Sequence, residues 1–280
     1  MKEDSSPTRS REGTSEQSAA YLRATFGLQG KVAFITGSRE GLGEATAIGF
    51  AKAGARVAVT SRTGKGLEGL VDRIRAIGSE ALPLALELRD LDQVRSVVDK
   101  TVEHFGRFDI LVNNVGYATR GDSLTYARSD WDEIMEVNLR GSFYMAQAAA
   151  PHMIKVGGGS IINISTAFAH TAMRHRAAYA ASKAGLEHMT RILAVEWARH
   201  KITVNVVAPT TMLTPTRAHV FPTPEAVQER VNLVPMGRAL GRLQVPDDVV
   251  PAIVFMAAEG ARFITGATLV VDGGFSIEKA

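Results

Sequence analysis

Seven short runs of apolar residues alternate with longer amphipathic segments along most of this chain, and this alternation limits what the chain can fold into. The short runs are hydrophobic at nearly every position, which is typical of strands covered on both faces of a sheet. Strands that alternate with helices in this way favour a parallel sheet with right-handed crossovers. The predicted strands are residues 32–36, 55–60, 82–88, 109–113, 159–164, 202–207 and 268–271. The predicted helices are residues 41–54, 66–78, 90–105, 130–155, 178–200 and 246–258.

The domain organisation follows from the same pattern. In a chain of 280 residues, neither an internal repeat nor an interdomain linker interrupts the alternation. We therefore predict one α/β domain over residues 26–280, with a doubly wound, seven-stranded parallel sheet and helices on both faces. Residues 1–25 are polar and charged, and we predict a disordered tail because such a segment buries too little surface to fold. Residues 210–241 read as an irregular, proline-containing substrate loop.

Composition excludes several classes of function. The chain has no cysteine, which rules out disulfides, thiolate catalysis and cysteine-ligated zinc. A net charge of +3, from 32 basic and 29 acidic residues, does not favour nucleic-acid binding. No apolar run reaches the roughly 18 residues of a membrane span. The histidines lack the spacing of metal ligands, so we predict no metal site. The first residues lack the apolar core of a secretory signal, and we predict a cytoplasmic protein.

A glycine-rich turn follows the first predicted strand and opens the first predicted helix. Gly37 allows a tight turn, Gly41 leaves room for a phosphate, and Gly43, after Leu42, lets the helix pack close to the strand. The free N–H groups and the positive dipole end of the helix N-terminus attract phosphate. The turn therefore predicts a dinucleotide pyrophosphate site. A purely structural turn is the alternative, which its position in the strand–helix pattern disfavours.

The end of the second strand bears on which nicotinamide cofactor is used. A carboxylate there would bind the ribose 2′-hydroxyl of NAD and repel the 2′-phosphate of NADP. Here Ser61 takes that place and Arg62 follows, and a guanidinium can pair with the phosphate. Arg39 in the glycine turn is a second candidate contact. These residues predict NADP(H), and the alternative is that Arg62 is simply solvated.

Tyr179 and Lys183 lie four residues apart in a predicted helix and so share one face. Reduction of a carbonyl requires a proton donor beside the carbon that accepts hydride, and oxidation of an alcohol requires a base there. A tyrosine with a pKa near 10 is a poor base at neutral pH, but a neighbouring ammonium favours the phenolate. The pair therefore predicts acid–base catalysis.

The spacing Thr-Gly-x-x-x-Gly-x-Gly at residues 36–43, together with Tyr-x-x-x-Lys at residues 179–183, resembles the short-chain dehydrogenase/reductase family. The resemblance covers about residues 26–275. It implies a Rossmann-type fold and a nicotinamide-dependent oxidoreductase. Within the family, the chain looks most like the 3-oxoacyl-carrier-protein reductase and gluconate 5-dehydrogenase branch.

The resemblance also implies a catalytic set. Tyr179 is the proton donor, and Lys183 binds the nicotinamide ribose. Asn138 supports the lysine through a water. The family places a serine thirteen residues before the tyrosine to bind the substrate oxygen, and that count falls on Thr166, which keeps the hydroxyl. Ser165 is the alternative if the loop differs by one residue.

Further cofactor contacts are implied in the same way. Glu87 stands where relatives usually carry an aspartate beside the adenine, and Asn114 belongs to a segment beside the cofactor. Thr214 matches a threonine that binds the carboxamide, while Thr210 replaces a glycine. With the residues above, the predicted cofactor set is Gly37, Arg39, Gly41, Leu42, Gly43, Ser61, Arg62, Glu87, Leu88, Asn114, Tyr179, Lys183, Pro209, Met212 and Thr214.

Two functional hypotheses follow. The first is an NADP-dependent enzyme that moves hydride between the nicotinamide and a carbonyl or secondary alcohol, such as a sugar acid, a polyol or a 3-oxoacyl compound. The second is a non-catalytic NADP-binding sensor or partner-binding protein, which the departures at Thr166, Thr210 and Glu87 favour. The intact Tyr179 and Lys183 favour the enzyme. A sugar-nucleotide epimerase would need a larger C-terminal domain.

Substrate and assembly are less constrained. The basic segment 174–176 (Arg-His-Arg) is compatible with an anionic substrate or with a solvated loop. The resemblance implies a homotetramer or homodimer in which the helices at 130–155 and 178–200 pack between subunits. Small-molecule substrates, and neither nucleic acid nor membrane, are the expected partners.

Overall fold

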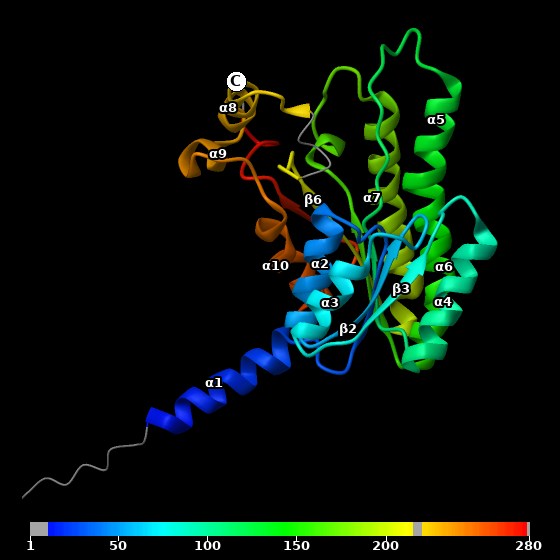
Figure 1. Cartoon of the computed structure of the whole chain (residues 1–280), viewed down its shortest axis with the longest axis vertical. Coiled ribbons are helices and arrows are strands. Elements are labelled where there is room, and N and C mark those ends of the chain that lie inside the picture. Colours follow the sequence, from blue (N-terminus) through cyan, green and yellow to red (C-terminus); the bar gives the residue numbers. More distant parts are fainter. Residues whose placement is uncertain (1–10, 215–219, 279–280) are drawn as a thin grey trace, which may run out of the picture.

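A sheet of seven parallel strands forms the centre of the computed structural model, which describes residues 11–214 and 220–278 (Figure 1). The strands lie in the order β3-β2-β1-β4-β5-β6-β7. This arrangement confirms the predicted α/β fold and parallel sheet. The strands are β1 (Val32–Ile35), β2 (Arg56–Ser61), β3 (Ala81–Ala85), β4 (Ile110–Asn113), β5 (Gly159–Ile164), β6 (Ile202–Pro209) and β7 (Thr268–Val271).

Helices cover both faces of the sheet, which explains why most strand residues are apolar. Along β1, Ala33 and Ile35 pack into one core cluster and Val32 and Phe34 into the other, and all four are fully buried. Helices α2 (Gly41–Lys52), α3 (Glu68–Ala76) and α10 (Pro246–Ala257) complete the cluster of Ala33 and Ile35. Helices α4 (Leu91–Phe105), α6 (Gly141–Lys155) and α7 (Ala177–Trp197) complete the cluster of Val32 and Phe34.

Within residues 11–214 and 220–278, the structure has no helix with the length and apolar character of a membrane span.

The order of the strands reverses between β1 and β4, and this reversal positions the site. From β1 the chain builds outward through β2 to β3, and then returns to place β4 on the other side of β1. The connections that leave β1 and β4 therefore run in opposite directions. In sheets of this kind a crevice opens at the carboxyl ends of two such strands, and ligands bind there.

The helix predicted at 130–155 is divided by a wider turn. It consists of α5 (Arg128–Met135), a π-helical turn over Glu136–Arg140, and α6. A π turn accommodates one extra residue, and such turns occur frequently at functional sites. The hydrophobic pattern indicated the helix but not this local widening.

The prediction that residues 1–25 are disordered is wrong for residues 11–25, which belong to α1 (Arg11–Phe26). Residues 1–10 lie outside the described part. Nine of its 16 residues are alanine, glutamate, glutamine, leucine or arginine, which are strong helix formers, so local propensity favours the helix. Figure 1 shows α1 projecting away from the domain. Its last turn meets the domain, where the rings of Phe26 and Phe255 lie 6.1 Å apart.

The segment 210–241 is also more regular than predicted. It contains α8 (Pro224–Asn232) and α9 (Pro235–Leu240), while residues 215–219 are not described. Each of these helices has its proline in the first turn, where the missing N–H costs nothing because that group has no partner inside the helix. Two of the prolines that suggested an irregular loop, Pro224 and Pro235, thus mark helix starts.

We expect deletion of residues 1–21 to lower the melting temperature by less than about 3 °C. The reason is that the deletion keeps Thr25 and Phe26, which contact the domain, and removes residues such as Tyr21, whose surface is mostly exposed. Thermal unfolding of both proteins at one protein concentration measures the change. A fall of more than about 8 °C would show that α1 supports the core.

Candidate active site

A cleft lies along the carboxyl ends of the central strands and gathers nearly all of the predicted site residues. Its two parts share Gly37, Glu40, Val115 and Gly116 and have volumes of about 470 and 360 Å³. The predicted residues Gly43 and Asn138 are not among the described residues that line the cleft. The predicted residues that line the first part are Gly37, Arg39, Ser61, Arg62, Glu87 and Leu88, and those that line the second are Gly37, Gly41, Leu42, Asn114, Thr166, Tyr179, Lys183, Pro209, Met212 and Thr214.

The glycine turn is held by a backbone contact that excludes any side chain at residue 43. A Cβ atom placed on Gly43 would lie 2.1 Å from the carbonyl oxygen of Gly37 and 2.6 Å from Nδ2 of Asn114. Gly37 has φ of +68°, a left-handed conformation that glycine adopts without strain. Helix α2 can therefore begin close to the end of β1.

The first turn of α2 has no side-chain cap. Glu40 occupies the N-cap position but its side chain makes no capping hydrogen bond, and its carboxylate pairs instead with Arg39 at 2.7 Å. The N–H groups at the start of an uncapped helix can bind an anion. The turn thus has the chemistry of a phosphate site.

Asn114 joins the end of β4 to this turn. Its Nδ2 donates to the carbonyl oxygens of Thr36 (3.0 Å) and Gly37 (2.9 Å). In return the hydroxyl of Thr36 accepts hydrogen bonds from the N–H groups of Asn114 and Val115. These bonds hold the two walls of the crevice together. Asn114 therefore positions the glycine turn through its side chain and also lines the cleft.

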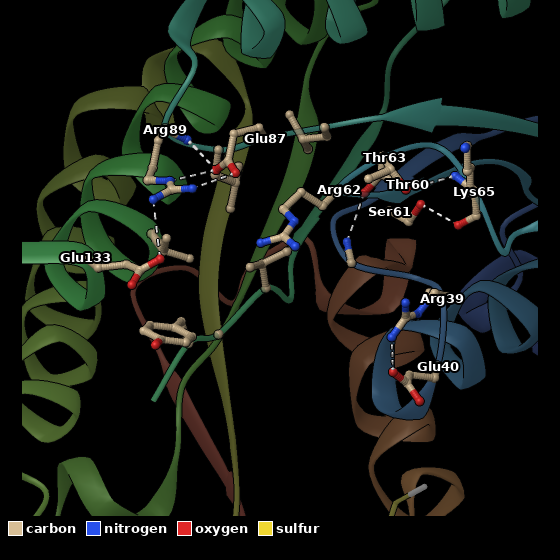
Figure 2. Close-up of a pocket in the computed structure, with 17 residues that line it drawn as sticks. Arg39, Glu40, Thr60, Ser61, Arg62, Thr63, Lys65, Glu87, Arg89 and Glu133 are labelled. Carbon is tan, nitrogen blue, oxygen red and sulfur yellow. Dashed lines mark hydrogen bonds and ion pairs between the residues drawn. The ribbon is translucent and has the colours of Figure 1, made fainter. Parts of the chain in front are cut away.

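Positive charge collects in the first part of the cleft, beyond β2 (Figure 2). Figure 2 shows Arg62 pointing into the space between Glu87 and Arg39. In the described part of the chain, Arg62 forms no hydrogen bond or ion pair, whereas Arg39 is paired with Glu40. The Ser61 hydroxyl, at the end of β2 where NAD-binding relatives of this fold carry a carboxylate, donates to the carbonyl oxygen of Lys65 at 2.8 Å.

Glu87 is neutralised by a residue that the sequence did not indicate. Arg89 contacts the carboxylate of Glu87 at 3.0 Å and that of Glu133 at 3.3 Å, and both contacts are drawn in Figure 2. The hydrogen bond from Arg89 lowers the pKa of Glu87, so this carboxyl is ionised and paired near neutral pH. The acidic residues that line this part of the cleft therefore each have an arginine partner.

Lys183 is completely buried beside the end of β5. Its Nζ donates to the carbonyl oxygen of Ile164 at 2.8 Å. Burial lowers the pKa of Lys183 to about 8, and the negative charge of Glu187 partly opposes this shift. Tyr179 lies one turn earlier on α7 and lines the same part of the cleft. The helix thus presents a phenol and an ammonium to one cavity.

Asn138 lies in the π-helical turn, fully buried, which excludes an exposed or capping role for it. Its amide exchanges two hydrogen bonds with the backbone of Tyr117, at 2.8 and 2.9 Å, and its Nδ2 also donates to the hydroxyl of Ser182 at 3.0 Å. Ser182 precedes Lys183 and donates to the carbonyl oxygen of Tyr179. Asn138 therefore ties the segment after β4 to the turn of α7 that carries Tyr179 and Lys183.

The two hydroxyl groups after β5 differ in their use. The Ser165 hydroxyl donates its proton to Oε1 of Glu187 at 2.6 Å. The Thr166 hydroxyl accepts a hydrogen bond from the N–H of Phe168 at 3.3 Å, which leaves its own proton available for another group. Both residues line the cleft.

Two features of the site lay outside the predicted set. Glu187 and Arg89 hold predicted residues in place, and the spacing of Glu187, four residues after Lys183, was a usable signal. The basic segment 174–176 is absent from the described lining of the cleft. His175 in that segment has φ of +63°, and its carbonyl oxygen accepts a hydrogen bond from Gly121.

Comparison with known proteins places these features in a family. A family model described as enoyl-(acyl carrier protein) reductase matches residues 37–276. The chain is 37% identical over 255 residues to 2-dehydro-3-deoxy-D-gluconate 5-dehydrogenase of Escherichia coli, covering 91% of this chain and 98% of that enzyme. It is also 37% identical over 251 residues to 3-oxoacyl-[acyl-carrier-protein] reductase of Thermotoga maritima, covering 89% and 99%.

A solved structure agrees with these relatives. The crystal structure of a gluconate 5-dehydrogenase from Burkholderia cenocepacia, in complex with NADP and tartrate, is similar with a TM-score of 0.86 and 33% identity. The similarity covers 92% of this chain and 100% of that chain. The likeness therefore extends over the whole sheet and the cleft.

The buried position of Lys183 predicts how stability depends on pH. Its pKa is about 8 in the folded protein, against 10.5 for a lysine exposed to water, so the unfolded chain binds the proton more tightly. The stability of the protein relative to Lys183→Met should therefore rise as the pH increases from 8 towards 10.5. Between pH 7.5 and 9.5 we expect a relative gain of about 2 kcal/mol.

Urea unfolding of both proteins at the two pH values measures this gain, and the comparison cancels the groups that titrate in both. A stability difference that stays constant, or that falls with pH, would contradict a depressed pKa for Lys183.

Proposed function

Because this chain belongs to the short-chain dehydrogenase/reductase family, we propose that it is an NADP-dependent oxidoreductase that moves hydride between the nicotinamide and a carbonyl or secondary alcohol. The observation that carries this proposal is the meeting of two features in one cleft. The phosphate-type glycine turn forms one wall, and Tyr179, Lys183 and Thr166 line the same cavity. A protein that only bound the cofactor would not need this group of proton-handling residues.

The residues present fit a dinucleotide. Gly43 lets α2 begin close to β1, and the uncapped N–H groups at this start suit a pyrophosphate. The first part of the cleft extends beyond β2, where an adenosine ribose would lie. Asn114, Pro209, Met212 and Thr214 line the second part, on the side of Tyr179 and Lys183. When bound, the nicotinamide supplies or accepts the hydride.

Arg62 supports NADP over NAD. Its guanidinium enters the cleft next to Ser61, and in the described chain it forms no hydrogen bond or ion pair, although its charge contributes to the lowered pKa of Glu87. A 2′-phosphate would give this charge a partner, and charge-assisted hydrogen bonds to phosphate are strong. Arg39 could contribute only by exchanging Glu40 for the phosphate, since the two are paired.

Acid–base chemistry is assigned to three side chains. Thr166 and Tyr179 would hold the substrate oxygen, with the free hydroxyl proton of Thr166 pointing to it as a donor. In reduction Tyr179 gives its proton to that oxygen, and in oxidation it takes the proton back. The Lys183 charge favours the phenolate form of Tyr179. Thr166 is preferred over Ser165 because the Ser165 proton is already committed to Glu187.

Sugar acids are the first substrate class to examine, followed by polyols and 3-oxoacyl compounds. The support is the names of the relatives described above, a dehydrogenase of 2-dehydro-3-deoxy-D-gluconate and a reductase of carrier-bound 3-oxoacyl groups. The segment 210–241 is assigned as the substrate loop, because Thr210, Met212 and Thr214 at its start line the cleft. The route from Lys183 through a water to Asn138 remains a prediction.

The protein is further assigned as a cytoplasmic homotetramer or homodimer. Ile192 and Val195 on α7 expose 48% and 80% of their surfaces, and exposed apolar residues on one helix face suit contact with a second subunit. The location itself rests on sequence alone.

The cofactor assignment can be tested by titration of nicotinamide fluorescence. We expect Arg62→Ala to weaken NADPH binding about tenfold to a hundredfold and to leave NADH binding nearly unchanged, because only NADPH carries the 2′-phosphate. Arg75→Ala is the matched control, since this arginine on α3 is exposed and lies outside the cleft. An equal loss of affinity for both cofactors, or no loss for either, would show that Arg62 does not bind the 2′-phosphate.

The catalytic assignment requires a turnover assay with NADPH against sugar acids, polyols and 3-oxoacyl compounds. We expect Tyr179→Phe to lower kcat by about 10²- to 10⁴-fold while the NADPH Kd stays within about threefold. Tyr144→Phe on α6 is the control, because Tyr144 lies outside the cleft. Tight NADPH binding without turnover of any of these classes would favour the sensor hypothesis.

A further inference from the structure

Glu187 is a buried carboxylate that the mechanism above does not use. It lies on α7 four residues after Lys183, and its side chain is 6% exposed. An ionised group that is removed from water is costly unless it is paired and hydrogen-bonded. Two ionisable groups face it in the described part of the chain, namely His170 from the segment after β5 and Lys183 from its own helix. Its surroundings therefore define what it does.

The contacts of Glu187 bracket the residue assigned to the substrate oxygen. Ser165, just before Thr166, donates to Oε1 of Glu187 at 2.6 Å. His170, four residues after Thr166, places Nε2 3.2 Å from the same oxygen. Between them Thr166 begins the 3-10 turn Ala167–Ala169, in which backbone bonds run from Ala169 to Thr166 and from His170 to Ala167. One carboxylate thus holds both ends of a single turn.

The same residue acts on the lysine. Lys183 donates to the carbonyl oxygen of Ile164, which directly precedes Ser165. The ammonium and the Ser165 contact therefore attach adjacent residues at the end of β5 to adjacent turns of α7. The charge of Glu187 also opposes the effect of burial on the Lys183 pKa.

We propose that Glu187 is a positioning residue for the reaction: through Ser165 and His170 it holds the turn that carries Thr166, next to the end of β5 to which Lys183 donates. This inference rests on the proposed function, because the positions of Thr166 and Lys183 matter for catalysis only if they have the roles assigned above. Glu187 itself touches neither substrate nor cofactor.

Two substitutions separate the two effects. Glu187→Gln keeps an oxygen that can accept from Ser165 but removes the charge. Glu187→Leu removes both the acceptor and the charge at similar volume. Glu196→Gln is the matched control, because Glu196 lies on the same helix and is exposed.

Hydrogen exchange of the free, full-length protein tests the tether. In Glu187→Leu we expect the amides of residues 168–170 to exchange about tenfold faster or more, with peptides from α6 unchanged. In Glu187→Gln and in Glu196→Gln these amides should exchange as in the wild type. Unchanged exchange at residues 168–170 in Glu187→Leu would overturn the tether.

A double-mutant cycle in urea at pH 7.5 tests the charge. Without Glu187 the pKa of Lys183 should fall further, so Lys183 should cost more stability at this pH. We expect Lys183→Met to shift the urea midpoint upward in the Glu187→Gln background, relative to its effect in the wild type, by about 0.3 M or more. An equal effect of Lys183→Met in both backgrounds would show that the charge of Glu187 does not act on Lys183. If Glu187→Leu fails to fold, Glu187→Gln alone still decides this point.

Kinetics complete the test. We expect Glu187→Leu to lower kcat by about tenfold to a hundredfold, because the Thr166 hydroxyl that binds the substrate oxygen is displaced. The NADPH Kd should stay within about threefold of the wild type, because the glycine turn is unchanged. A kcat equal to that of the wild type would overturn the positioning role. Exchange and urea unfolding need neither cofactor nor substrate, so a failure of the proposed function, seen as no turnover by the wild type, is distinguishable from a failure of this inference.

Discussion

The close approach of Gly43 to the carbonyl oxygen of Gly37 is the contact on which the site depends. It sets how near α2 begins to the end of β1, and a side chain at residue 43 would collide with backbone. Asn114 donates into the same point and so attaches the end of β4 to the turn after β1. The strand order reverses between these two strands, and a cleft opens where their connections part. The first residues of α2, Gly41 and Leu42, line this cleft, so the N–H groups of the helix start lie beside it.

Buried polar groups support the opposite wall, and they orient its residues more than they add to stability. Asn138, Ser182, Lys183 and Glu187 are all buried. Burial of such residues costs free energy that their hydrogen bonds mainly offset, so their net contribution to stability is small. These side chains act mainly on geometry, because the hydrogen bonds of a buried polar network are fully formed only when its members keep one arrangement. The π-helical turn around Asn138 is part of this arrangement, since it brings the amide between Tyr117 and Ser182.

The fold was predictable because its strands are covered on both faces. A strand such as β1, whose four residues are all buried, is apolar throughout, and such runs are visible in the sequence. The failures have physical causes. Helix α1 forms from local propensity and contacts the domain at its last turn, so its sequence lacks the hydrophobic face by which helices are usually predicted. The prolines of α8 and α9 look the same in a sequence whether they break a helix or begin one.

The candidate site divides in the same way. Residues joined by local spacing, such as Gly37 with Gly43 and Tyr179 with Lys183, could be predicted to act together from the sequence. The partners of Asn138 and Glu187 could not be predicted, because they are distant in the sequence. Asn138 contacts Tyr117 and Ser182 at separations of 21 and 44 residues, and Glu187 contacts Ser165 at a separation of 22. The choice between Ser165 and Thr166 likewise depends on such a distant contact.

The sequence by itself determined the α/β architecture, the glycine turn and the tyrosine–lysine pair, because each depends on residue types at short, regular spacing. Only the tertiary structure decided that Arg62 forms no ion pair in the described chain while Arg39 forms one, that Glu87 is paired with Arg89, and that the Ser165 hydroxyl donates to Glu187. These outcomes depend on which side chains meet when distant segments pack. Contacts between distant side chains depend on the path of the backbone in space, and the spacing of residues in the sequence does not define that path.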